Sequence, residues 1–202
     1  MKIRIVALCL IFVTSLGLAQ ESPKPAAKAV AAERAAMLEG LRRGKPIKGS
    51  HEQYRHVPEV FAVERRGSAE TPQQAISRVG ASGRKVLEFK GNFVLFRATQ
   101  QKPAFVERVA GSAMYPTVVN DRTGTFGVLT GTLVVKPKSM AESSAIASRY
   151  GLEITKEYAQ LRTVLFRVKS GMDVADVTAA LQADPRIESA YPEIIEHVHM
   201  PK

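Results

Sequence analysis

Residues 131–192 carry the pattern that most constrains the fold, because strand and helix signals follow one another there in a fixed order. A strand-like run, TLVVK, is followed by a helical stretch that ends at Gly151, the residue type best able to take a left-handed conformation. Two more strand-like runs, LEITKEY and LRTVLFRVK, are joined by a tight turn. A second helical stretch begins at Asp173, and a last strand covers residues 187–191. The predicted order of elements is β-α-β-β-α-β.

Local signals support both predicted helices. Ser139 and Glu142 have the S-x-x-E spacing of a capping box, in which two side chains satisfy free backbone N–H groups at the helix start. Asp173 is a typical cap for the second helix. The order of elements is the split βαβ arrangement of a ferredoxin-like fold, so we predict an α+β protein with this fold at residues 131–192.

The predicted topology leaves one face of the sheet uncovered. Each right-handed crossover returns its helix to the same side of the sheet, so both helices cover one face. Val164, Phe166 and Val168 alternate onto this covered face. By the same alternation, the opposite face would present five side chains for contact with a partner: Glu153, Thr155, Glu157, Thr163 and Leu165.

Residues 57–130 are predicted to form a β-rich domain ahead of this one. The runs KVLEF and FVLFRA flank the turn residues 90–92, and YPTVVN and TFGVLT flank a second turn, so we expect two hairpins. Thr71-Pro72 opens a short helix between the strands. The word VLFR at residues 94–97 recurs at residues 164–167, which indicates either a decayed copy of the β-α-β-β half or chance.

The N-terminal part of the chain indicates export. Residues 1–19 have the layout of a secretory signal peptide, with basic Lys2 and Arg4, an apolar run and small residues near the end. We therefore expect a periplasmic protein, or an extracellular one. Residues 20–56 predict a leader that is partly helical or disordered, because proline and glycine bracket an Ala- and Lys-rich run. No later segment approaches the roughly 20 consecutive apolar residues of a membrane-spanning helix. The one cysteine, Cys9, lies in the signal, so we expect no disulfide.

The charge balance narrows the choice of partner only slightly. The whole chain has a formal net charge of +10. Such a balance suits an acidic partner, a nucleic acid or an anionic surface and does not choose among them. The basic residues are scattered and follow no recognised nucleic-acid-binding motif, so we predict no nucleic-acid partner.

The sequence offers no catalytic constellation. A nucleophile elbow needs G-x-S-x-G and a zinc protease needs H-E-x-x-H, and the sequence contains neither word. His197 and His199 would share one face of a strand and could bind a metal with the help of Glu193 or Glu196. Two solvated imidazoles are the simpler interpretation, and a pair that titrates near roughly pH 6.5 and modulates docking is another. We predict no enzyme, no metal and no cofactor.

Several words between residues 131 and 192 resemble a known family. The words LVVKP, AIASRYGLEI, YAQLRTVLFRV and DVTAALQADPRIESAYPE resemble the N-terminal prodomain of subtilisin-like serine proteases, which inhibits and folds its cognate enzyme. Here we expect no catalytic domain to follow, and the sequence lacks the subtilase triad motifs. The layout resembles the free-standing external chaperones of kexin-like bacterial serine proteases. This resemblance implies a co-secreted subtilisin- or kexin-like protease as the partner, in a 1:1 complex.

The resemblance also implies where the two proteins would touch. The open sheet face, with Tyr191 on its last strand, would lie on surface helices of the protease, and Glu153 or Glu157 would sit at the N-termini of those helices. The extended tail at residues 193–202 would enter the substrate groove by strand addition, with Lys202 suited to a pocket for basic residues. The predicted groove-binding residues are Glu193, Ile194, Ile195, Glu196, His197, Val198, His199, Met200, Pro201 and Lys202.

Other interpretations of the whole chain and of its tail stay open. The protein could be a general inhibitor of subtilases that has no role in folding. It could also be a basic module that binds the cell envelope through its positive charge. A frayed terminus without a role is the alternative for the tail.

Overall fold

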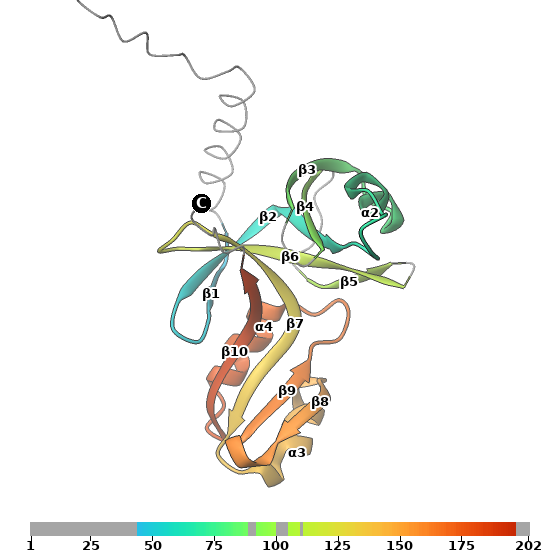
Figure 1. Ribbon diagram of the computed structural model, residues 1–202. Coiled ribbons are helices and arrows are strands. Elements are labelled where there is room, and N and C mark those ends of the chain that lie inside the picture. The colour runs from blue at the N-terminus through green and yellow to red at the C-terminus, as the bar shows by residue number, and fades with distance from the viewer. Residues whose placement is uncertain (1–43, 89–91, 100–104, 110, 197–202) are drawn as a thin grey trace, which may run out of the picture. The chain divides into compact units, whose positions relative to one another are not determined.

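The computed structural model describes residues 44–88, 92–99, 105–109 and 111–196 (Figure 1). The signal peptide expected at residues 1–19 and most of the expected leader lie outside these ranges. The described chain is an α+β protein in which ten antiparallel strands form one sheet. The order along the main path is β3-β4-β2-β6-β7-β9-β8, while β1, β5 and β10 pair with β2, β6 and β7 respectively.

The described part of the N-terminal half contains six strands and one helix, and the two expected hairpins are present. Strands β3 and β4 pair with each other, as do β6 and β7. The expected end of the leader at residue 56 falls inside a strand, because β1 and β2 already form a hairpin there. The elements are β1 (Pro46–Lys48), β2 (Gln53–Glu64), α2 (Pro72–Arg78), β3 (Gly83–Glu88), β4 (Phe93–Ala98), β5 (Glu107–Val109) and β6 (Ser112–Asn120).

The C-terminal half has the predicted order of elements. Strand β7 leads through two helical segments to the hairpin of β8 and β9, and α4 then connects β9 to β10. Gly151 ends α3 with a φ of 63°, and Asp173 caps α4 by accepting hydrogen bonds from two backbone N–H groups. The elements are β7 (Phe126–Pro137), η1 (Met140–Glu142), α3 (Ser143–Tyr150), β8 (Glu153–Tyr158), η2 (Ala159–Leu161), β9 (Thr163–Arg167), α4 (Val174–Gln182) and β10 (Ile187–Glu196).

The predicted start of a separate domain at residue 131 cuts through a continuous strand. The first part of β7 pairs with β6, and its second part, Thr132–Val135, pairs with β9. Gly131 lies between the two parts with a φ of 81°, and its carbonyl accepts a hydrogen bond of 2.8 Å from the N–H of Val168. Glycine takes this left-handed conformation at little cost, so β7 changes neighbour without ending. The two halves therefore share one strand.

The predicted capping box at Ser139 and Glu142 does not form. Ser139 precedes the short 3-10 helix η1, and its side chain makes no capping hydrogen bond. The Glu142 carboxylate instead lies 3.7 Å from Nε of Arg186. Nη2 of the same arginine lies 2.6 Å from the Asp184 carboxylate. The Glu142 carboxylate, which the local pattern assigned to the helix start, therefore forms an ion pair with a residue distant in sequence.

Three clusters of buried side chains form the core. The largest joins both halves, because it combines Val118 and Leu129 with Phe166 of β9 and Leu181 of α4. A second cluster includes Ala62, Leu95 and Val128. The third packs α2 against the N-terminal strands through residues such as Ile76 and Phe96.

The two halves repeat one arrangement, which accounts for the recurring word VLFR. Strands β3-β4-β2 stand in the same order as β8-β9-β7, and a helix follows β2 and β7, the strand that comes first in sequence in each set. Leu95 lies opposite Ala62 in one half, as Leu165 lies opposite Val134 in the other. Each hairpin is also bulged beside this leucine, next to residue 86 in one and residue 155 in the other. Order, register and bulge agree, which favours a structural repeat over chance.

Candidate docking surface

The four strands β10, β7, β9 and β8 lie side by side and have one face covered by helices (Figure 1). Leu133 of β7 and Phe166 of β9 lie opposite each other and are fully buried. They share a cluster with Ile146 of α3 and Leu181 of α4, so both helices pack on this face. Because side chains alternate along a strand, the neighbouring residues point to the opposite, open face.

The open face is crossed by one row of four side chains. Tyr191 of β10 lies opposite Val134 of β7, Val134 lies opposite Leu165 of β9, and Leu165 lies opposite Lys156 of β8. Directly opposed residues share a face of the sheet, so the four belong to one surface. The first three side chains are partly exposed and Lys156 is exposed. This row of two aliphatic side chains, one phenol and one amine is the centre of the candidate docking surface.

A bulge in β8 changes which of its side chains reach the open face. The register shifts between Ile154 and Lys156, and the hydroxyl of Thr155 donates a hydrogen bond of 2.9 Å to the carbonyl of Leu165. Glu153, before the bulge, lies opposite Arg167 and on the open face. Glu157, after the bulge, lies opposite buried Val164 and therefore on the helix side. A single extra residue inverts the alternation of all that follows.

The predicted docking residues are thus only partly brought together. Glu153, Thr163, Leu165 and Tyr191 lie on the open face, whereas Thr155 forms the bulge and Glu157 belongs to the other side. The sequence-based prediction also missed two residues of β8 that the bulge brings to the open face. These are Lys156 and Tyr158, and the Lys156 ammonium lies 4.7 Å from the centre of the Tyr158 ring.

One further residue was missed although the alternation could have found it. Val134 stands between Leu133 and Val135 in the run TLVVK, so its side chain had to point away from the helices. Beside the open face, at the turn between β8 and β9, Leu161 has an exposed fraction of 67%. Arg162 follows with a φ of 48° and lies 3.5 Å from the Glu188 carboxylate. The turn between β8 and β9 therefore exposes one large aliphatic side chain to solvent.

The first four residues of the predicted tail belong to the sheet. Glu193 to Glu196 are the end of β10, where Ile194 pairs with Leu129 and Ile195 pairs with Val128. The hydroxyl of Thr130 donates a hydrogen bond of 2.6 Å to the Glu193 carboxylate. The extended tail predicted from residue 193 therefore begins four residues too early, because the alternating run IESAYPEIIE continues as one strand.

A buried polar network holds the end of β10. Asn120, at the turn between β6 and β7, has an exposed fraction of 1% and donates a hydrogen bond to Glu52 of the loop before β2. Thr125, on the other side of that turn, lies 3.5 Å from the carboxylate of Glu196. Burial, together with the charge of Glu196, raises the pKa of Tyr54 to about 12, so this phenol stays neutral. The network holds Glu196, the last described residue of β10.

The structure leaves part of the prediction untested. His197 to Lys202 lie outside the described residues, so the interpretations of His197 and His199 stay predictions. Within the described ranges, no group of three or more His, Cys, Asp or Glu side chains is arranged to hold a metal ion. None of the helices there has the length and apolar character needed to cross a membrane.

Comparison with known proteins identifies the family. An α+β protein with one half-covered antiparallel sheet is the class that the fold defines. Residues 70–201 match the Open reading frame 2 N-terminal domain, and the chain belongs to this family. Among solved structures, a chain of the crystal structure of the Aeromonas sobria serine protease in complex with the chaperone ORF2 is similar at 20% identity. The match has a TM-score of 0.36 and covers 48% of this chain and 99% of that one. The curated proteins gave no match.

Proposed function

We propose that this protein is an exported, non-catalytic chaperone that helps a serine protease of the subtilisin or kexin type to fold. The observation that carries the proposal is the match of residues 70–201 to the Open reading frame 2 family. The chaperone of the Aeromonas sobria complex bears the same name, ORF2, and its partner is a serine protease. The words that resemble a subtilase prodomain lie inside the matched range.

The topology of the C-terminal half supports a prodomain-like, ferredoxin-like assignment. Its elements follow the order β-α-β-β-α-β, and the strands pair so that β10 and β8 are the outer strands beside β7 and β9. This is the split βαβ arrangement, which leaves a sheet face available because both helices lie on the other side. A folding chaperone needs such a face, because it must present a preformed surface to a partner that is not yet native.

The docking step would use the row from Tyr191 to Lys156. Val134 and Leu165 supply apolar area, and Tyr191 supplies an aromatic ring, which is the residue type enriched in interface cores. Ligand binding to the native state alone stabilises that state by mass action. A chaperone that binds the native-like protease surface would therefore lower the free energy of the late folding state.

The tail would act as an inhibitor of the folded protease. Because Ile194 to Glu196 pair with β7, the segment that enters the substrate groove in this proposal begins at His197 and ends at Lys202. An extended peptide adds to a groove as a strand, and its backbone supplies affinity while alternate side chains supply specificity. Lys202 would occupy a pocket for basic residues.

Refolding of the partner protease tests the folding role. A subtilisin-like protease secreted by the same organism would be unfolded in denaturant and diluted with or without an equimolar amount of this protein. Recovery of activity should rise severalfold with the wild-type chain and fall back with Leu165→Glu, which places a charge in the centre of the row. Arg84→Gln, an exposed change on β3, is the matched control and should behave as wild type. Equal recovery without the chaperone would leave only an inhibitor.

A truncation separates inhibition from folding. Removal of residues 197–202 should abolish inhibition of the mature protease while refolding assistance by the open face persists. A 1:1 complex should be seen by gel filtration with light scattering when wild-type protein is mixed with mature protease. If the truncated chain inhibits as strongly as the whole chain, the tail does not occupy the groove.

A further inference from the structure

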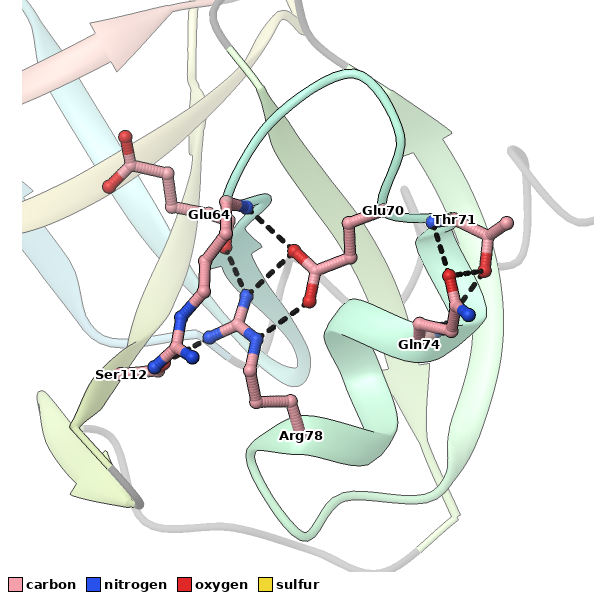
Figure 2. A network of polar contacts seen from close by, with 7 residues as sticks. Glu64, Glu70, Thr71, Gln74, Arg78 and Ser112 are labelled. Carbon is pink, nitrogen blue, oxygen red and sulfur yellow. Dashed lines mark hydrogen bonds and ion pairs between the residues drawn. The ribbon is translucent and has the colours of Figure 1, made fainter.

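A concave site lies in the N-terminal half, apart from the row on the open face. It has a volume of about 520 Å³ and is formed by the end of β2, the end of α2, β5 and the start of β6. Figure 2 shows the polar network on one of its walls. The lining side chains that matter for its chemistry are Glu64, Arg65, Arg66, Arg78, Arg108 and Tyr115.

Two of the four arginines are fixed by carboxylates outside the pocket. Arg78 donates from Nε and Nη2 to the two oxygens of Glu70, at 2.7 and 3.0 Å (Figure 2). The same Nη2 donates to the carbonyl of Glu64 at 2.7 Å, and the N–H of Arg66 donates to Glu70 at 2.6 Å. Arg65 forms an ion pair with Glu88. These contacts restrain the two guanidinium groups. Because they are already held in place, they lose little further conformational freedom when a ligand binds.

Two guanidinium groups converge on one neutral oxygen in this wall. The hydroxyl oxygen of Ser112 accepts a hydrogen bond from Nη1 of Arg78 and another, at 3.3 Å, from Nη2 of Arg66. Like charges that converge on a hydroxyl repel each other, and an anion beside that hydroxyl would relieve the repulsion. The surrounding groups are almost all donors, which is the chemistry that carboxylates require.

The cation best placed to meet a ligand comes from β5, where Arg108 pairs with Ala113, the neighbour of Ser112 on β6. Arg108 of β5 is exposed, and it forms no ion pair with the residues that the structure describes. Tyr115 stands beside it on β6, partly buried, and burial raises the pKa of its phenol, which therefore remains a hydrogen-bond donor at neutral pH. Figure 2 shows the Glu64 carboxylate directed away from the Arg78 guanidinium, so it does not occupy the position between the arginines.

We propose that this arginine pocket binds the carboxylates of an acidic peptide segment from a protein partner. The volume of about 520 Å³ is within the range of pockets that hold a drug-sized ligand, and it far exceeds the space of one small anion. Several arginines around one space suit successive acidic side chains better than a single charge does, because Arg108 can bind one carboxylate bidentately while the other guanidinium groups attract its neighbours. The proposal stands on the pocket alone and does not depend on the protease assignment.

Direct binding of a defined probe tests the site. The probe is a blocked, fluorescent five-residue peptide with three central aspartates between two glycines, and the comparison peptide has three asparagines instead. Binding to the full chain is measured by fluorescence anisotropy at low and at high salt. The aspartate peptide should bind and weaken as salt rises, because charge pairs near the surface are screened. The asparagine peptide should not bind.

Three variants, each of which removes one charged side chain, locate the binding. Arg108→Gln should weaken the aspartate peptide about tenfold, as expected for the loss of one charge-assisted contact. Arg84→Gln removes the same charge outside the pocket and should change the affinity less than about twofold. Glu64→Gln removes the one carboxylate that lines the pocket and should strengthen binding. Equal effects of Arg108→Gln and Arg84→Gln would overturn the proposal, because they would show attraction by net charge alone.

Inorganic phosphate distinguishes a peptide site from a site for a free anion. In the proposed site, phosphate at the concentration of the peptide should displace little of it, because one anion replaces only one of several contacts. If phosphate binds in a manner that depends on Arg108 while the aspartate peptide does not bind, the pocket serves a small anion and the proposal is wrong. Circular dichroism of each variant confirms that the fold is retained.

Discussion

The side-chain amide of Asn120 donates a hydrogen bond of 3.0 Å to the carboxylate of Glu196. The amide is almost completely buried, and its own carbonyl oxygen accepts hydrogen bonds from the N–H groups of Arg122 and Thr123, at 2.9 and 3.1 Å. One side chain therefore shapes the turn between β6 and β7 and also holds the last residue of β10. The proposed groove-binding segment begins at the next residue.

Substitution of Asn120 should release the end of β10. Asn120→Ala removes the donor to Glu196 and leaves two turn N–H groups without their acceptor, so we expect a loss of about 1–3 kcal/mol in the free energy of unfolding. Amide exchange at Ile194 and Ile195 should become faster by more than this global loss explains, which mass spectrometry of the peptide can measure. Thr99→Ala, which breaks an exposed contact with Ser82, is the control. Unchanged exchange at Ile195 would show that pairing with β7 alone holds the strand.

Truncation of two adjacent residues of β9 should lower the free energy of unfolding by very different amounts. Phe166 is fully buried under the helices, so Phe166→Ala should cost about 3–5 kcal/mol of unfolding free energy. Leu165 is partly exposed on the open face, so Leu165→Ala should cost only about 1 kcal/mol or less. Denaturant titration of the two variants measures the difference. Comparable losses would mean that the face with Leu165 is covered in solution, which would remove the proposed docking surface.

His56 predicts a specific dependence of stability on pH. Its side chain has an exposed fraction of 5%, and Nε2 has no hydrogen-bond partner among the described residues. Burial lowers the pKa of His56 from its ordinary value, an effect that nearby Asp173 opposes and Lys45 reinforces. The unfolded chain therefore takes up this proton at a higher pH than the folded chain does. The free energy of unfolding should fall as the pH drops from about 6.5 through the lower folded pKa.

A variant isolates this contribution. His56→Leu should flatten the profile between about pH 5 and pH 7, whereas His51→Gln, at an exposed position in the loop before β2, should leave it unchanged. Glu70 does not interfere in this window, because Arg78 lowers its pKa to about 2 and its contribution is lost only in stronger acid. A wild-type profile that is flat from pH 7 to pH 5 would contradict the burial of a neutral imidazole at this site.

The order of elements could be predicted because each element has a local signal. The local signals are hydrophobic periodicity, Asp173 at a helix start and Gly151 at a helix end. They specify these elements without any contribution from residues distant in sequence. Features that depend on a distant partner could not be predicted in this way. Glu142 has the correct spacing for a capping box. Its carboxylate instead pairs with Arg186, which lies 44 residues further along the chain.

The candidate docking surface was less predictable than the fold for a related reason. Alternation assigns a face only while the strand is regular, and nothing in ITKEY marks Thr155 as the extra residue of a bulge. The same limit applies to the pocket of four arginines. Arg66 follows β2, Arg78 ends α2 and Arg108 lies on β5, so only the tertiary fold places them around one space.

The shared strand β7 leads to a prediction about the C-terminal half by itself. A fragment of residues 131–202 would match the domain expected from the sequence, but it would lack Val128 and Leu129, the partners of Ile195 and Ile194. It would also lose Ile47, Val106, Ala113, Val118 and Leu129 from the cluster that surrounds Phe166.

We therefore expect this fragment to show no cooperative thermal unfolding by near-ultraviolet circular dichroism, whereas the chain from residue 44 onward should unfold in one transition. Extending the fragment to residue 126 restores the strand pairing of β7 with β10 and returns Leu129 to the core, but Ile47, Val106, Ala113 and Val118 are still missing, so it should remain non-cooperative. Val106 explains why, because its Cγ2 would lie 3.0 Å from a Cβ added at Gly131 and so packs directly against the junction of β7. A sharp transition in the fragment of residues 131–202 would show that the C-terminal half is an independent domain after all.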